Sequence, residues 1–173
     1  MPNATTGIET VLRDLQYGTG GFIICFTTVY EAFANTLSYL ADTTPLRVKI
    51  ANVRLPASHG SICSALEQTI YDLTGQGQNP RLALFETVTT TPGIRMPFEK
   101  LIEKYRTHSV LSCVDAAHGI GQIPFDLPAL DPDFLATNCH KHLHPTFLVH
   151  AHSSTCPFEI SISCVPPCLP ALG

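Results

Sequence analysis

The sequence predicts an α/β domain: a mostly parallel sheet with helices on both faces, in three layers. Short apolar runs alternate with segments whose apolar residues recur every three or four positions. Strands separated by single helices at this rhythm are typical of parallel sheets. Charged residues make up 14% of the chain and hydrophobic residues 45%, as expected when most elements are buried. We find no internal repeat.

The first half of the chain contains the elements that begin this alternation. A helix is predicted up to Leu15, because its apolar residues follow helical spacing behind Thr5 or Thr6, either of which can cap it. The run "GFIICFTTV" (21–29) is rich in strand-forming residues. A second helix is predicted over Ala32–Leu40, and "ADTTP" ends it. "RVKIANVRL" (47–55) alternates like a strand.

The second half continues the pattern. A third helix is predicted over Ile62–Leu73, and "RLALFETV" (81–88) is the next strand, followed by a loop rich in Thr, Pro and Gly. A fourth helix is predicted over Phe98–Tyr105 because Leu101 and Ile102 face inward. "SVLSCVDA" (109–116) and the short "DFLATN" (133–138) complete five predicted strands.

Composition excludes several classes of protein. The net charge is -4 and no basic stripe is interleaved with aromatic residues, so nucleic acid is not expected as a partner. No apolar run reaches the roughly 18 residues that a membrane span needs. The first residues do not resemble a signal peptide, and seven cysteines, an odd number, argue against a disulfide framework. We therefore expect a cytoplasmic protein in which Cys25, Cys63 and Cys113 are inert core thiols.

Two polar sites follow neighbouring predicted strands. In parallel sheets ligands bind beyond the carboxyl ends of the strands. Asp115 and His118 follow one strand, and His140 and Lys141 follow the next, so their side chains should lie close together. Asp115 alone could simply cap the next helix, and Lys141 alone could be a solvated surface lysine. An amine held where solvent is limited, however, becomes nucleophilic enough to form an imine.

The start of the first helix adds a third site. Thr5, Thr6 and Gly7 lie where free amides and the helix dipole can bind an anion, although an ordinary N-cap has the same sequence. The three sites together would bind one ligand with a phosphate for this helix, a ring nitrogen for Asp115 and an aldehyde for Lys141. Pyridoxal 5'-phosphate has these three groups.

The same residues carry a resemblance to a known family. "VDAAHGIGQIPFDLPALDPDFLATNCHKHL" resembles the cofactor-lysine region of aminotransferase class V, a group of fold-type I pyridoxal-phosphate enzymes. "NATTGIETVLR", "TTVYEAFANTLSYL" and "PGIRMPFEKL" extend the resemblance, which covers about residues 3–145 and is closest to the isopenicillin N epimerase-like and fungal hercynylcysteine sulfoxide lyase branch. It implies a partial cofactor-binding large domain over residues 1–145 and a homodimer.

The resemblance also implies roles for single residues. Lys141 would form the internal aldimine, a Schiff base, and later shuttle the Cα proton. Asp115 would keep the pyridine nitrogen protonated, and His118 would hydrogen-bond the phenolic oxygen of the cofactor. The other assigned positions surround the phosphate and the ring: Ala4, Thr5, Thr6, Asn138 and His140 for the phosphate, Tyr30 for the ring face, and Thr90 or Thr91 near the cofactor.

These residues imply an enzyme that acts on an amino acid through a Cα carbanion. Loss of a sulfur leaving group at Cβ would make it a carbon–sulfur lyase similar to hercynylcysteine sulfoxide lyase. An epimerase, an aminotransferase or a truncated non-catalytic remnant are the alternatives. No Arg follows Arg106, although the family's small domain supplies an arginine for the substrate carboxylate, so the chain is expected to be a fragment.

The last residues differ from the rest. The segment 146–173 contains no Lys, Arg or Asp and is rich in Pro and Cys, which predicts an irregular tail outside the family sequence, as a shifted reading frame or an intron would produce. Residues 157–165 could form one edge strand. Five histidines between His140 and His152, with Cys139, Cys156, Cys164 and Cys168 nearby, leave a zinc-binding module as a rival interpretation.

Overall fold

The computed structural model describes residues 3–18, 21–138 and 141 of the chain. In chain order its elements are α1 (Ala4–Asp14), β1 (Gly21–Phe26), α2 (Glu31–Thr43), β2 (Arg47–Ala51), α3 (His59–Gly75), β3 (Asn79–Glu86), α4 (Phe98–Thr107), β4 (Leu111–Asp115), α5 (Leu127–Leu130) and β5 (Phe134–Ala136).

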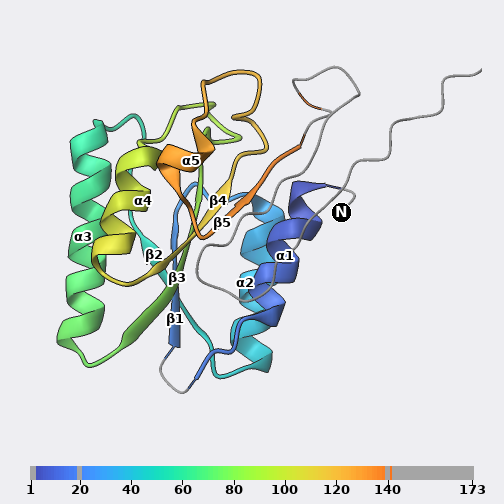
Figure 1. Ribbon diagram of the computed structural model, residues 1–173. Helices are drawn as coiled ribbons and strands as arrows, with labels where there is room; N and C mark the ends of the chain where they lie inside the picture. Colours follow the sequence, from blue (N-terminus) through green and yellow to red (C-terminus); the bar gives the residue numbers. More distant parts are fainter. Residues whose placement is uncertain (1–2, 19–20, 139–140, 142–173) are drawn as a thin grey trace, which may run out of the picture.

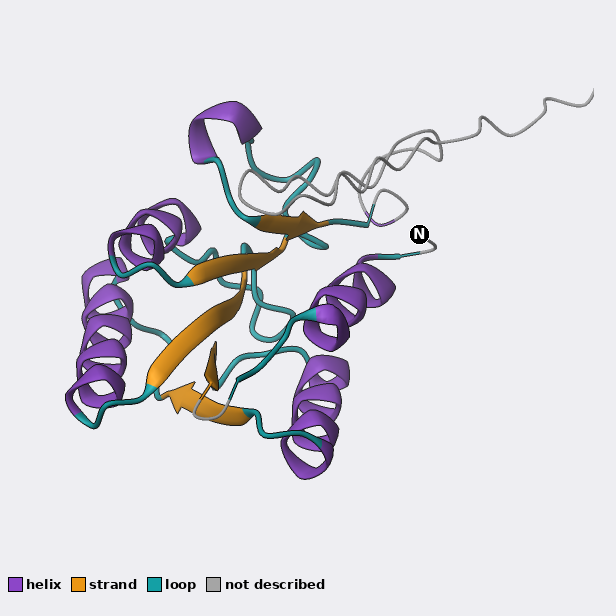
Figure 2. Ribbon diagram, turned by 60° about the horizontal axis from the view of Figure 1, so that its bottom comes forward, coloured by secondary structure: helices purple, strands orange, loops and turns teal. Residues whose placement is uncertain are grey.

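The five strands form one sheet in the order β2-β1-β3-β4-β5, and every neighbouring pair is parallel. Helices α1 and α2 cover one face, and α3 and α4 cover the other (Figures 1 and 2). The predicted α/β class with a parallel sheet in three layers is confirmed. Because all strands run the same way, their carboxyl ends meet at one edge of the sheet.

Each strand divides its side chains between two cores. On β3, Ala83 and Phe85 belong to the core under α3 and α4, whereas Leu82 and Leu84 belong to the core under α1 and α2. This alternation is the period of two that a strand imposes. The same alternation determines which side chains face α1 at the end of a strand. On β3 they are the residues an even number of positions from Leu82 and Leu84.

All five predicted strands and four predicted helices are present, but two details of the prediction are wrong. The N-cap of α1 is Asn3, not Thr5 or Thr6: the Asn3 side chain accepts a hydrogen bond from the Thr6 amide at 2.8 Å. Asn and Thr are both favoured caps, and the spacing alone did not separate them. The short helix α5 was not predicted, because four residues do not produce a helical period; the Asp126 side chain caps it.

Several predictions concern residues outside the described part of the chain. They are the edge strand at 157–165, the irregular tail and the histidines and cysteines of the zinc interpretation. Within the described residues, every helix falls short of the length and apolarity needed to cross a bilayer. No cluster of three or more His, Cys, Asp or Glu suited to a metal occurs in that same part.

Candidate functional site

A pocket of about 180 Å³ lies at the carboxyl edge of the sheet, next to the start of α1. Its lining residues are Asn3, Ala4, Thr5, Tyr30, Thr90, Asp115, Ala117, His118, Asn138 and Lys141. Eight of the ten residues predicted for the cofactor are among them. Of the other two, Thr6 is not part of the lining and His140 lies outside the described residues.

Asp115 is the buried acid of this pocket. It is the last residue of β4, 6% exposed, and its Oδ1 accepts a hydrogen bond from the Ala117 amide at 2.8 Å. Burial raises the pKa of Asp115 to about 6, while the Ala117 hydrogen bond and the charge of Lys141 oppose the rise. The residues that follow form turns rather than a regular helix, so Asp115 does not act as the cap of one.

Lys141 and His118 meet at the rim of the pocket. The Lys141 Nζ lies 2.9 Å from the His118 Nε2, which brings together residues from the turn after β4 and from beyond β5. The prediction that solvent is limited at Lys141 is wrong, because the side chain is exposed. The cause is its position: Lys141 lies past the end of β5, beyond the sheet that buries Asp115.

The start of α1 forms another part of the pocket wall. The buried Asn138, just after β5, accepts a hydrogen bond from the Ala4 amide at 2.8 Å and so ties α1 to the sheet. Asn3 accepts from both the amide and the hydroxyl of Thr6. Thr5 lies between Ala4 and Thr6 in the sequence and lines the pocket. No described residue supplies a hydrogen-bond acceptor for its amide or its hydroxyl.

Two further predicted residues close the pocket from the side. Tyr30 immediately precedes α2, is 40% exposed, and meets Phe33 edge to face with ring centroids 5.6 Å apart. Between the two threonines left open by the sequence, Thr90 lines the pocket and Thr91 does not. Both Tyr30 and Thr90 come from loops that follow strands, β1 and β3, as the rule for parallel sheets predicts.

Sequence reasoning missed three residues of this region. Asn3 caps α1 and lines the pocket, and the small side chain of Ala117 lies in its wall. Glu86 ends β3 and is paired in register with Asp115. A signal for Glu86 existed: "RLALFE" ends on an acid after an apolar run, just as "VLSCVD" does.

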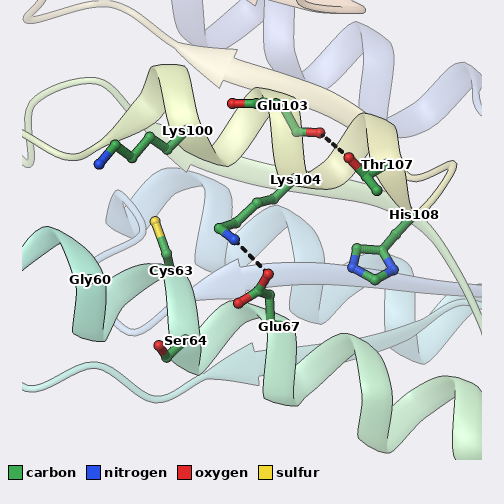
Figure 3. A pocket seen from close by; sticks show the side chains of 9 residues that line it. All are labelled: Gly60, Cys63, Ser64, Glu67, Lys100, Glu103, Lys104, Thr107 and His108. Atoms are coloured by element: carbon green, nitrogen blue, oxygen red, sulfur yellow. Dashed lines mark hydrogen bonds and ion pairs between the residues drawn. The ribbon is translucent and has the colours of Figure 1, made fainter.

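A second groove, of about 550 Å³, lies between α3 and α4 on the other face of the sheet (Figure 3). Lys104 crosses it to Glu67, with 2.5 Å between Nζ and Oε1, and both side chains are about one-third exposed. Burial raises the pKa of the Cys63 thiol, which also lines the groove, so this sulfur remains a protonated and poor nucleophile. The groove has the composition of a solvated polar surface.

The pocket at the carboxyl edge has the groups expected of a pyridoxal-phosphate enzyme, and comparison with known proteins gives the same class. Residues 1–147 match aminotransferase class V, and the chain belongs to this family of pyridoxal-phosphate enzymes. The chain is 36% identical over 141 residues to the L-cysteine desulfhydrase-like protein lolT2 of Epichloe uncinata, a match that covers 82% of this chain and 30% of the relative. It is 28% identical to the hercynylcysteine sulfoxide lyase of Schizosaccharomyces pombe, covering 82% and 35%.

Solved structures agree on the fold. The complex of the cystine C-S lyase C-DES with its reaction product cysteine persulfide superimposes with a TM-score of 0.68 at 20% identity, covering 81% of this chain and 36% of that chain. The chain therefore spans about one third of the length of the proteins it matches.

The residues of the pocket fit the family's cofactor, pyridoxal 5'-phosphate. A buried carboxyl (Asp115), an accessible amine (Lys141) and a helix N-terminus whose Thr5 has no hydrogen-bond partner among the described residues lie around one hollow. The side chains of Ala4 and Ala117 are small and leave room for a flat ring. These groups correspond in kind to the ring nitrogen, the aldehyde and the phosphate of the cofactor.

Proposed function

We propose that the chain supplies the cofactor-binding part of a pyridoxal-phosphate-dependent carbon–sulfur lyase. The observation that carries this proposal is the single pocket shared by Lys141, Asp115 and the start of α1. The names of the curated relatives, desulfhydrase-like and sulfoxide lyase, favour a sulfur leaving group on an amino acid. Within this class we propose a substrate of the hercynylcysteine sulfoxide kind. We also propose a homodimer, as the family resemblance implies, and a cytoplasmic location, as the odd number of cysteines indicates.

Each residue would have a chemical task. The bound cofactor would supply an electron sink for the bond broken at Cα of the amino acid. Lys141 would hold the aldehyde carbon and, after the substrate amine has displaced it, take the Cα proton. Asp115 would keep a proton on the ring nitrogen through a charge-assisted hydrogen bond. His118, already 2.9 Å from the Lys141 amine, would contact the phenolic oxygen beside the aldehyde.

The start of α1 would bind the phosphate. Thr5 can donate from both its amide and its hydroxyl, and the helix dipole favours a negative charge there. Because Asn138 already accepts from the Ala4 amide through its oxygen, its side-chain amino group would be the free donor toward the phosphate. Tyr30 would pack against the ring, and Thr90 would lie at the edge of the site.

The elimination balances without an oxidant or a reductant. The Cα proton goes to Lys141, the Cβ–S bond breaks with both electrons going to sulfur, and the departing sulfur takes up a proton. From a thioether the sulfur leaves as a thiol, from a thiol it leaves as hydrogen sulfide, and from a sulfoxide it leaves as a sulfenic acid. The three-carbon enamine that remains hydrolyses to pyruvate and ammonia.

The test uses the purified chain incubated with pyridoxal phosphate. Wild type should gain an absorbance band in the visible, and borohydride should fix the cofactor to the peptide that contains Lys141. Lys141→Ala should lose both signals, while Lys100→Ala, which changes an exposed lysine of the second groove, should keep them. A wild-type chain without the band, or a cofactor fixed to another lysine, would contradict the proposal.

Substrate assays then separate the alternatives. Release of pyruvate from cysteine conjugates or their sulfoxides supports the lyase. Racemised amino acid without pyruvate would instead show an epimerase, and a 2-oxo acid from a sulfur-free amino acid would show an aminotransferase. A visible band with no product from any substrate would identify a non-catalytic remnant.

A further inference from the structure

Glu86 is a buried carboxyl that none of these roles uses. It is the last residue of β3 and is 4% exposed. Neither of its carboxyl oxygens has a well-aligned hydrogen-bond partner among the described residues, although the Thr90 side chain lies near enough to lower its pKa. Leaving a buried polar group unpaired is unfavourable, so a side chain of this kind calls for an explanation.

Glu86 lies beside Asp115 and faces the same layer. The two residues are partners in the register of β3 and β4, at the ends of both strands. On β3 the residue two positions earlier, Leu84, belongs to the core under α1 and α2, and on β4 Cys113 belongs to it as well. Because side chains alternate along a strand, Glu86 and Asp115 both point to the α1 face, where Ala4 begins the pocket wall.

Two charged groups act on Glu86 in the described part of the chain, Asp115 and Lys141, and His118 lies 2.9 Å from Lys141 in the same pocket. Asp115 adds a negative charge, and Lys141 is the group whose positive charge offsets it. Cys25 on β1 and Cys113 on β4 face the same layer, but burial raises the pKa of both thiols, so they stay neutral. The first turn of α1 contributes no acid.

The two carboxyls therefore hold their protons with different strength. Burial and then the charge of Asp115 raise the pKa of Glu86 to about 8, against smaller opposing effects of Lys141 and Thr90. The pKa of Asp115 rises only to about 6, because the Ala117 amide and Lys141 stabilise its charge. Near neutral pH the pair thus shares one proton and carries one negative charge, and Glu86 holds the proton more strongly because only Asp115 accepts the Ala117 hydrogen bond.

We propose that Glu86 is the proton store of the cofactor's ring-nitrogen site: it acts through Asp115 and gives up its proton when a pyridine ring binds there. The proton moves from the carboxyl pair to the ring nitrogen, so the pair gains one negative charge as the ring gains one positive charge. No proton has to come from solvent into a buried site. This inference rests on the proposed function, because it requires pyridoxal phosphate at Asp115.

The test measures proton uptake when pyridoxal phosphate binds. Isothermal titration calorimetry in buffers of different ionisation enthalpy gives the number of protons taken from solvent. At pH 7.5, Glu86→Gln should take up about 0.5 to 1 proton more per bound cofactor than wild type, because the amide cannot donate one. By the same linkage, its affinity relative to wild type should fall about tenfold or more between pH 6.5 and 8.5. Glu103→Gln, a change of an exposed acid on α4, should match wild type.

Infrared spectroscopy of the wild-type chain tests the same idea without a variant. A neutral carboxyl signal should be present at pH 7 and should decrease when the cofactor is added. Equal proton uptake in wild type and Glu86→Gln, or a carboxyl signal that binding leaves unchanged, would overturn the inference alone. A wild-type chain that binds no cofactor would overturn the proposed function, and this inference with it.

Discussion

The burial of Glu86 predicts a pH-dependent weakness in the fold that a single substitution removes. Its pKa is about 8 in the folded chain, against an ordinary value of 4.5. Below about pH 4.5 the acid is protonated in both the folded and the unfolded chain, so it has no effect on stability. Between about pH 4.5 and 8 the unfolded chain loses the proton while the folded chain keeps it, so stability falls as pH rises.

The size of the effect follows from these two values. At about 1.4 kcal/mol per pH unit, the interval corresponds to about 5 kcal/mol of lost stability at pH 8 and above. Part of this loss of stability comes from the repulsion between Glu86 and Asp115, since the two acids affect each other's ionisation. We therefore expect Glu86→Gln to stabilise the chain by less than about 1 kcal/mol at pH 5 and by about 2 to 5 kcal/mol at pH 8.5.

Urea unfolding at pH 5, 6.5 and 8.5, followed by circular dichroism, measures this difference. Glu103→Gln is the matched control, because it removes the same charge from an exposed position and should give the same small offset at every pH. A Glu86→Gln difference that does not grow with pH would refute the reasoning, since it would mean that Glu86 ionises normally in the folded chain.

Two further predictions concern contacts in and next to the pocket. Asn138→Ala removes the acceptor of the Ala4 amide and should lower the free energy of unfolding, measured with urea, by about 1 to 3 kcal/mol. Asn138→Asp keeps an acceptor and should lower it less. Equal losses of stability in the two variants would contradict this prediction. Gly119→Ala would place a Cβ 2.6 Å from the Thr87 Oγ1 and should destabilise the chain by about 1 to 3 kcal/mol. Gly75→Ala should not destabilise the chain, because a Cβ at Gly75 would have nothing within 4 Å. Similar melting temperatures for the two variants would contradict the predicted clash between residue 119 and Thr87.

The sheet and most of the pocket could be predicted because they depend on local patterns and one topological rule. Apolar runs gave the strands, and consecutive parallel strands must end at the same edge, which places Asp115 beside the start of α1 and Lys141 at the same hollow. The choice of Asn3 rather than Thr5 as the cap could not be predicted, because both residue types offer a side-chain oxygen.

Burial is what the sequence predicted least well, since it depends on packing between distant segments. Glu86 lies within the predicted strand 81–88 and no role was predicted for it, yet it is a buried acid, 4% exposed. Lys141 follows a buried strand, yet it extends past the end of the sheet into solvent. The omission of Glu86 and the error for Lys141 have the same origin: the type of a charged residue does not reveal how many neighbours the fold brings to it.

The placement of one ring between Asp115 and Lys141 is tested most directly by a crystal structure of the chain soaked with pyridoxal phosphate. We predict continuous density from the Lys141 Nζ to the aldehyde carbon, the ring nitrogen within hydrogen-bond distance of the Asp115 carboxyl, and the phosphate at Thr5. A cofactor bound elsewhere, or one whose ring nitrogen points away from Asp115, would contradict the assignment.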